Sequence, residues 1–519
     1  MHILKNASRR HFIQQAGAFT ALAGSAGAPI ALNLAAMGTA AAQSATDYKA
    51  IVCLFFFGGN DSFNMVLPTD TTSWTAYATT RNQQPDPISL LAPGTAPDGN
   101  AAVGTPARLG GVLPIAPLNA QNRSFALHPL MGSLRTLFDT EKRLAVLPNI
   151  GPLVMPTTKV QYGQSGHPKP ARLFSHNDQQ NTWQALGPEG ATRGWGGRMG
   201  DLLASNNTTP VFTAISASGN SVWLAGQTVQ QYQVSSGGAV ALGVNSSGQV
   251  YGSTAVGTAL HKLATTVRNT HPMDFDVAAV ANRSINAELT LRTALLPAGQ
   301  GPWGTPPSGS AGYNAGNDPL LRYFNPLTQA TAPSSLAQQL QVVARLVEAG
   351  IRGATGAKRQ VFFVSVGGFD THDLQNRGHA DLMARVAHAM SYFDATLGAL
   401  NARSNVTTFT ASDFGRTFTS NGDGTDHGWG SHHFVMGGAV KGGDLYGAFP
   451  TLAVKNANNN NFDGSMDQLG NGSLLPTTSV EQLGYTLGTW FGLSAGQLGG
   501  IFPNVMNFNA ATRNLGFFA

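Results

Sequence analysis

Three short, almost continuously apolar runs constrain the fold of this chain more than any other feature. They are residues 51–57 (IVCLFFF), 361–366 (VFFVSV) and 406–411 (VTTFTA). Such runs are typical of strands that are buried on both faces, which is the habit of parallel sheets. Cys53, the only cysteine, lies in the first run. No intramolecular disulfide can form, and we expect this thiol to be buried in the core.

Helical patterns lie between these runs. Apolar residues recur at helical spacing from Leu336 to Val347, after Ser334 or Ser335, either of which can cap the helix. A second apolar stripe, from Leu382 to Leu400, precedes the third run. Alternation of strand and helix predicts an α/β fold, with a mainly parallel central sheet flanked by helices.

The long polar middle of the chain is expected to lie beside this sheet and to include further strands, for example at residues 211–215. Residues 206–333 are rich in Gly, Ser, Asn and Thr and show few strong periodicities. We predict that they form a loop-rich insertion or cap. The α/β domain would then be assembled from residues 44–205 and 334–519, with the latter part carrying most of the candidate metal ligands.

The first 43 residues resemble a twin-arginine export leader. Residues 8–13 read SRRHFI, and a small-residue stretch follows that ends in an A-x-A-like site at residues 40–42. A retained membrane anchor is the weaker alternative, because Gly, Ser, Thr, Asn and Pro interrupt the run. We therefore expect the twin-arginine export machinery as a partner and a periplasmic or secreted protein.

Charge and hydropathy exclude two classes of partner. Removal of residues 1–43 takes away three basic residues and no acidic ones, so the net charge falls from +5 to +2. No basic stripe remains, so binding to nucleic acid is not indicated. No later segment is long and apolar enough to cross a membrane, so the mature chain is expected to lack an integral span.

An acidic residue follows each apolar run after glycine or another small residue. These acids are Asp61, Asp370 and Asp413, and the glycine pairs 58–59 and 367–368 precede the first two. In open α/β sheets, ligands bind outside the carboxyl ends of the strands. We therefore expect the three carboxylates to lie on one rim, where glycine lets the backbone turn and leaves room for a ligand.

Histidines and a further acid lie close to these positions in the sequence. They are His372, Asp426, His427, His432 and His433, the last four in the glycine-rich segment GTDHGWGSHH. Carboxylate and imidazole together suit zinc, manganese or iron, and a cation would relieve the repulsion between neighbouring acids. A metal-free polar network is the alternative.

The nucleophile is the least defined part of the predicted site. Ser62, next to Asp61, and Ser175 are the candidate nucleophiles, and a water activated by metal is a third possibility. A turn or helix cap would also explain Ser62, and a hydrogen-bond network would explain Ser175. Arg416 could bind a substrate oxyanion, or it could form a salt bridge with a rim acid.

Several longer motifs resemble those of a known family. In chain order they are FFFGGNDSFNMVLP, LHPLMGSL, LFSHNDQQNTW, GWGGRM, VGGFDTHDLQ, SDFGRT, GTDHGWGSHHFVMGGAVKGGDLYG and the closing WFGLS and IFPNVMNF. They look like the bacterial family of unknown function numbered fifteen-oh-one, within the alkaline-phosphatase-like superfamily that includes the sulfatases. The resemblance spans nearly all of the chain after the leader.

The resemblance implies an alkaline-phosphatase-like sandwich with two metal ions on the sheet rim. Zinc, manganese, calcium and magnesium are not distinguished. Asp61 matches the first aspartate, while Asp370 and His372 resemble the middle pair without its usual wider spacing. Either Asp413 or Asp426 with His427 answers to the later pair, and His432 or His433 to the last histidine. No C/S-x-P-x-R element exists, so a typical formylglycine sulfatase is not expected.

Two functions remain open at this level. The first is a periplasmic metal-dependent hydrolase of phosphate or sulfate esters, acting on a small-molecule or polymer substrate. The second is a non-catalytic, metal-stabilised binding or assembly protein of the cell envelope. The hydrolase is the leading hypothesis, and the absence of an obvious nucleophile and the long polar middle segment are the features that favour the second.

Overall fold

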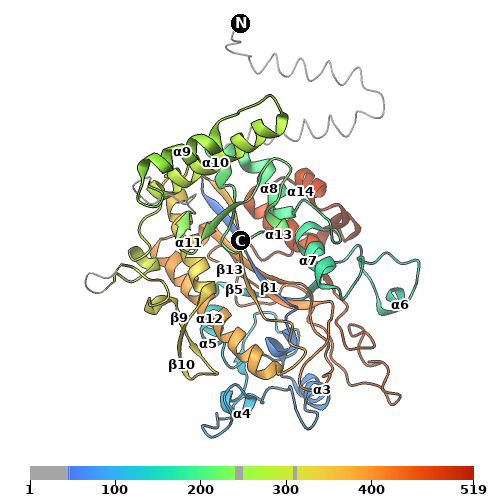
Figure 1. Ribbon diagram of the computed structural model, residues 1–519. Helices are drawn as coiled ribbons and strands as arrows, with labels where there is room; N and C mark the ends of the chain where they lie inside the picture. The colour runs from blue at the N-terminus through green and yellow to red at the C-terminus, as the bar shows by residue number, and fades with distance from the viewer. Residues whose placement is uncertain (1–44, 46, 240–248, 308–311) are drawn as a thin grey trace, which may run out of the picture.

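A nine-stranded sheet runs through the centre of the molecule (Figure 1). In pairing order its strands are β14 (Thr478–Ser479), β5 (Leu144–Gly151), β13 (Ser431–Gly437), β12 (Val406–Ser412), β1 (Lys49–Phe57), β11 (Arg359–Gly367), β6 (Ala214–Ser216), β7 (Tyr232–Ser235) and β8 (Gly238–Ala239). β13 runs antiparallel to both of its neighbours, as β8 does to β7, and the other pairings are parallel. The predicted mainly parallel central sheet is confirmed.

The computed structural model describes residues 45, 47–239, 249–307 and 312–519. The candidate export leader, residues 1–43, lies outside the described residues and stays a prediction. In the part of the chain that is described, no helix combines the length and the apolar character needed to cross a bilayer.

The three apolar runs are adjacent strands. β1 lies between β11 and β12 and is parallel to both, with Ile51 opposite Val361 on one side and Thr407 on the other. Alternate residues of β1 enter different cores: Val52 and Leu54 pack on one face of the sheet, and Cys53 and Phe55 on the other. Burial on both faces explains why the run has no polar alternation, and Cys53 is buried as predicted.

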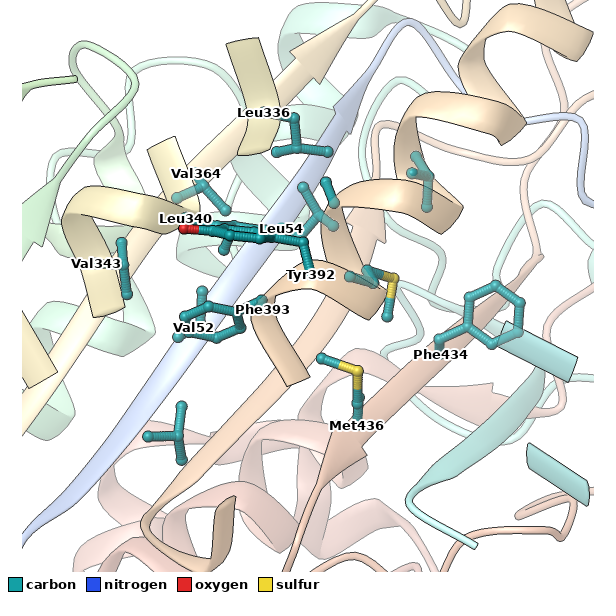
Figure 2. Close-up of a cluster of buried hydrophobic side chains, with 14 of the residues drawn as sticks. Val52, Leu54, Leu336, Leu340, Val343, Val364, Tyr392, Phe393, Phe434 and Met436 are labelled. Atoms are coloured by element: carbon teal, nitrogen blue, oxygen red, sulfur yellow. The ribbon is translucent and has the colours of Figure 1, made fainter. Parts of the chain in front are cut away.

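Helices α11 (Ser335–Ile351) and α12 (Gln375–Ala399) cover one face together with α5 (Gly132–Asp139). Figure 2 shows Leu336, Leu340 and Val343 of α11 beside Val52 and Leu54 of β1. The hydroxyl of Ser334 accepts a hydrogen bond from the Ala337 amide, so Ser334 is the cap of the two serines considered.

The opposite face carries α7 (His176–Ala185), α8 (Trp195–Leu203), α13 (Val480–Phe491) and α14 (Ala495–Ile501). Smaller elements complete the fold. They are α3 (Thr71–Arg81), α4 (Pro106–Leu109), α6 (Lys159–Tyr162), the three-stranded sheet of β2 (Val66–Pro68), β4 (Phe125–Leu127) and β3 (Leu113–Ile115), and the hairpin of β9 (Arg322–Asn325) and β10 (Ala330–Pro333).

Residues 206–333 are more regular than the sequence analysis expected. This segment supplies β6, β7 and β8 to the edge of the central sheet. It also forms α9 (Thr254–Thr265) and the 23-residue helix α10 (Pro272–Ala294). The segment thus lies beside the sheet and contributes strands to its edge, but it also contains two helices that its composition did not indicate. Apolar residues lie on more than one side of α10, with Phe275 and Leu289 opposite the row of Met273, Val277 and Val280, and this weakens the pattern that would reveal the helix in the sequence.

Two buried histidines, His128 and His379, pack edge to face with ring centroids 5.7 Å apart. Burial lowers the pKa of His379 to about 4, although the charge of Asp61 opposes that shift. Burial and the neighbouring His379 also hold the pKa of His128 well below its ordinary value. Both rings are therefore neutral in the folded protein at neutral pH.

These histidines predict acid sensitivity. Unfolded histidine has a pKa of about 6.5, so the unfolded chain binds more protons than the folded chain between pH 6.5 and about 4. The stability that the neutral His379 ring contributes is complete above pH 6.5 and is lost as the pH falls towards 4. Replacement His379→Gln should flatten the profile of unfolding free energy by about 1.4 kcal/mol per pH unit in this window. Urea unfolding of both proteins at pH 7.5, 6 and 5 measures this, and parallel profiles would contradict it.

Candidate functional site

The carboxyl ends of the three central strands meet on one rim of the sheet. Phe57 of β1 pairs with Gly367 of β11, and Phe56 pairs with Ser412 of β12, so the segments that follow begin side by side. Gly58 has a positive φ of 117°, and a Cβ there would lie 2.3 Å from the backbone nitrogen of Asp370. Only glycine allows the turn after β1 to approach Asp370 this closely.

Three side chains from separate segments converge above this turn. Ligand-type atoms of His176, Asp370 and His427 all lie within 4.8 Å of one another. The Nε2 atom of His176 is 3.4 Å from one oxygen of Asp370, and that of His427 is 3.4 Å from the other. We call these three residues the rim cluster. Asp370 is 43% exposed, so solutes can reach it.

Both imidazoles of the rim cluster are oriented by a partner on the far side of the ring. The Nδ1 atom of His176 lies 2.7 Å from a carboxylate oxygen of Asp413, and that of His427 lies 2.7 Å from the carbonyl oxygen of Phe174. A carbonyl only accepts, so the Nδ1 of His427 carries the proton and its Nε2 lone pair points inward. Metal-ligating histidines are held in this way by carboxylates and carbonyls.

Asp413 is the buried anchor of this arrangement. Its Oδ2 atom accepts hydrogen bonds from the Gly58 amide at 3.1 Å and the Gln180 side chain at 2.8 Å, in addition to the contact with His176. Its Oδ1 atom is buried and has no hydrogen-bond partner among the described residues. Asp413 therefore lies next to the rim cluster, where it contacts the ring of His176 rather than the centre of the cluster.

Arg416 fixes Asp370. The guanidinium is completely buried and donates to Asp370 at 2.6 Å, to the Gly58 carbonyl and to Thr425. Its three nitrogens are therefore already engaged. Of the two roles considered from the sequence, the structure supports the salt bridge with a rim acid.

The pKa shifts follow from these contacts. Burial works against ionisation of Asp370, but the hydrogen bond and charge of Arg416 outweigh it, so the pKa lies below its usual value. The hydrogen bond with Asp413 raises the pKa of His176. Burial lowers the pKa of His427, and the charges of His176 and Arg416 add to that effect. An anionic carboxylate thus faces one basic and one neutral imidazole.

His372 and Asp426 lie at the exposed margin of the rim cluster. The Nε2 atom of His372 is 3.1 Å from Asp370 and 3.0 Å from the Nε2 of His427. Its Nδ1 atom is 3.4 Å from a carboxylate oxygen of Asp426, which is 61% exposed. The structure therefore brings both of these candidate ligands close to Asp370 and His427.

Asp61 lies in the core and pairs with Arg81 instead of joining the rim cluster. The carboxylate forms a fully buried, two-pronged salt bridge with Arg81, at 2.6 and 3.0 Å, and accepts a further hydrogen bond from Gln375. Its Oδ1 atom also caps the short helix that begins at Ser62. The expected place of Asp61 beside Asp370 and Asp413 on the open rim is therefore corrected, because its oxygens are taken by a guanidinium within the core.

His432 and His433 are also placed differently from expectation. They lie within β13 rather than in a loop, and their neighbours lie on opposite faces of the sheet: Phe449 beside His432, and Trp183 beside His433. Both are fully buried, and burial lowers the pKa of each to about 3. Adjacent residues of a strand point in opposite directions, so the pair cannot share one ion.

Neither candidate serine presents a free hydroxyl to the rim cluster. Ser62 is completely buried in the short helix after Asp61, and its Oγ has no partner in the part of the chain that is described. Ser175 precedes α7 and donates to Asp178 at 2.9 Å.

The residue that sequence reasoning missed is His176, one position beyond Ser175. It is the first residue of α7, and packing of that helix against the sheet brings it to Asp413. The only signal in the sequence was its place within the motif LFSHNDQQNTW.

The donor set constrains the ion that the site could hold. Two imidazole nitrogens and one carboxylate suit zinc, manganese or iron, with the nitrogens favouring these over calcium or magnesium, which prefer oxygen ligands. Three protein ligands also leave coordination positions for water and substrate, as in catalytic rather than structural sites. The residues present therefore fit a single transition-metal ion of the catalytic type.

Comparisons with known proteins give a family match to part of the chain and two distant likenesses. A family described as "Protein of unknown function (DUF1501)" matches residues 326–499, which contain Asp370, His372, Asp413 and His427. No curated protein matches the chain. A crystal structure of Ps i-CgsB in complex with k-i-k-neocarrahexaose is 10% identical, with a TM-score of 0.32, over 91% of this chain and 78% of that one. A structure from Bacteroides thetaiotaomicron, described in terms of glycosaminoglycan metabolism, is 9% identical, with a TM-score of 0.29, over 86% and 73%. Likenesses this weak carry no information about activity.

Proposed function

We propose that the rim cluster binds one divalent transition-metal ion and that the protein uses it to hydrolyse esters of phosphate or sulfate. The observation that carries the proposal is the orientation of the two imidazoles. Asp413 and the Phe174 carbonyl engage the Nδ1 atoms, so both Nε2 atoms are directed at Asp370. Outer partners of this kind are a regular feature of metal-binding histidines.

One ion is proposed rather than the two implied by the resemblance. Three of the residues expected to hold metal, Asp61, His432 and His433, are engaged or buried away from the rim cluster. Arg81 supplies the positive charge beside Asp61. The guanidinium thus compensates a buried carboxylate that would otherwise need a second cation.

Each residue of the site has a proposed task. His176, Asp370 and His427 hold the ion, and Arg416 and Asp413 are positioning residues that fix Asp370 and His176. His372, with Asp426 behind it, is proposed to carry a proton to the leaving oxygen rather than to bind metal. Its ring is 40% exposed and reaches both Asp370 and the solvent-facing Asp426.

The ester class follows from what such an ion offers. A bound divalent cation supplies a Lewis acid that polarises an ester oxyanion and lowers the pKa of a water molecule. Water is the proposed nucleophile, because the hydroxyls of Ser62 and Ser175 are buried or engaged. The choice of phosphate or sulfate esters rests on the motifs shared with the alkaline-phosphatase-like superfamily.

The same lack of a free hydroxyl supports a second candidate function. A chain that keeps the cation site without a presented nucleophile could act as a metal-stabilised binding or assembly protein of the envelope. The two candidates share metal binding and differ in turnover.

We also propose export through the twin-arginine route, with removal of residues 1–43, so that the protein works in the periplasm or outside the cell. The support is the SRRHFI box, the small-residue stretch and the A-x-A-like site.

Metal content tests the proposed ligands. The purified protein should contain about one transition-metal ion per chain, and His176→Ala or Asp370→Ala should remove it, since a site of three protein ligands cannot spare one. Asp61→Asn should keep the ion but lose about 3–5 kcal/mol of unfolding free energy, because Arg81 is left as an unpaired buried charge. Elemental analysis and urea unfolding measure both effects. His261→Ala, on exposed α9, is the control, and metal loss in Asp61→Asn would restore the two-ion alternative.

Turnover separates the hydrolase from the binding protein. Aryl phosphate, phosphodiester and aryl sulfate esters should be assayed with zinc, manganese and iron(II) added back. His372→Ala should retain the ion but lower kcat by about 10²–10⁴, the usual contribution of a general acid. If none of these esters is hydrolysed while the ion remains bound, the second candidate function is the correct one.

Export is tested by changing the two arginines of the leader. Arg9→Lys together with Arg10→Lys should leave the unprocessed chain in the cytoplasm, whereas the original chain should appear in the periplasmic fraction about 43 residues shorter. Mass spectrometry of each fraction reads the cleavage point. A full-length chain in the membrane fraction would show a retained anchor instead.

A further inference from the structure

The helical pair of α9 and α10 concentrates exposed apolar side chains. Of the twenty large apolar residues that are exposed in the described part of the chain, eleven lie between Tyr251 and Leu296. They are Tyr251, Val256, Leu260, Leu263, Val267, Met273, Phe275, Val277, Val280, Leu289 and Leu296. In Figure 1 the two helices lie together at one end of the molecule. We call this surface the hairpin face.

The exposed residues follow the spacing of helix packing interfaces. Val256, Leu260 and Leu263 of α9 recur at intervals of four and three residues, and Met273, Val277 and Val280 of α10 repeat the same intervals. Side chains at this spacing form one stripe along a helix and pack against another helix. Each helix of the pair thus presents a stripe suited to a helical partner.

Among the described residues, the hairpin enters the core at its far end, and Arg283 in the middle of α10 donates a hydrogen bond to Gln230 at the surface. Leu291 and Ala287 of α10 enter the main hydrophobic core, and Arg352 donates a hydrogen bond to the carbonyl of Ala294. In α9, by contrast, Gly257 is the only buried residue. A 12-residue helix that contains glycine and several threonines is marginal unless its apolar face is covered. The hairpin therefore needs a covering partner.

The two stripes expose enough apolar area for a small specific interface. Phe275 and Leu289 lie on the other side of α10 and do not belong to the stripes. With ordinary side-chain areas, the exposed fractions of Val256, Leu260, Leu263, Met273, Val277 and Val280 sum to on the order of 500 Å² per copy, so two copies would together bury about 1,000 Å², the least that a specific interface requires.

The charges of the hairpin distinguish between possible partners. Residues 251–296 carry four basic residues (Lys262, Arg268, Arg283, Arg292) and three acidic ones (Asp274, Asp276, Glu288), and no tryptophan. A surface that binds anionic lipid is typically rich in Lys and Arg on its polar face. In α10, Arg292 pairs with Glu288 of the same helix, whereas Asp274 and Asp276 near its start have Arg283 further along, so antiparallel apposition of two copies brings the aspartates towards Arg283.

We propose that the hairpin face is the contact of a symmetric homodimer, in which the α9–α10 pairs of two copies pack as four helices. The partner is a second copy of this chain. This contact is independent of the proposed function, because none of its residues belongs to the rim cluster.

Analytical ultracentrifugation of the full chain tests the dimer. The native protein should sediment at twice the chain mass at concentrations of about 10 µM, a range in which a small specific interface is populated. A variant with Leu260→Gln, Leu263→Gln and Val277→Gln should sediment as a monomer with unchanged circular dichroism. Leu118→Gln, at a residue 75% exposed outside the hairpin, is the matched control and should remain dimeric.

A cysteine cross-link locates the contact. Cys53 is buried, so Val280→Cys would supply an accessible thiol close to the proposed two-fold axis. Mild oxidation should link two copies through residue 280, and Leu118→Cys should not form this link. A monomeric native protein, or a dimer that persists in the triple variant, would overturn the proposal. Binding of the native chain, but not of the triple variant, to anionic phospholipid vesicles without dimerisation would replace the second copy with a membrane and overturn it equally.

Discussion

The burial of β1 on both faces is the constraint on which the rest of the structure depends. Alternate residues of this strand enter the two main cores, and its neighbours β11 and β12 are parallel to it. Each fully buried Val, Leu or Phe side chain contributes about 1.5–3 kcal/mol, so a shift of register by one residue would exchange the two packing surfaces at high cost. The same register brings the carboxyl ends of β1, β11 and β12 together. The packing of the core therefore determines where the candidate site lies.

The charges beneath and above this rim are compensated in different ways. Below the rim, Asp61 meets the guanidinium of Arg81, and neither side chain reaches solvent. At the rim, Arg416 is buried but its partner Asp370 remains partly exposed, with two imidazole nitrogens directed at it. A buried acid with a permanent cation has no need of an external ion. Asp370, by contrast, keeps an open side, which is why the proposed ion belongs there.

Much of the fold and part of the site could be predicted from the sequence, because those features depend on local pattern. Apolar runs identified the central strands, and the segments that follow β11 and β12 supplied Asp370, His372 and Asp413. His176 could not be assigned, because its place depends on how α7 packs against the sheet. Asp61 was misplaced because its partner Arg81 comes from the end of α3, and no spacing rule connects the two. His432 and His433 were misplaced because the glycine-rich sequence before them concealed the start of β13.

The position of α9 and α10, like that of His176, depends on contacts that local sequence pattern does not reveal. These contacts also bear on how the chain is stabilised. α9 and α10 carry apolar residues that the fold of one copy leaves uncovered, so no analysis of core pattern within a single chain would place them. The proposed cover is a second copy of the chain, whereas the rim cluster is formed within one chain. The two surfaces are therefore separable. Disrupting the hairpin face should change the association state and leave the ligands at the rim in place, because Asp370 is fixed by Arg416 and His176 by Asp413.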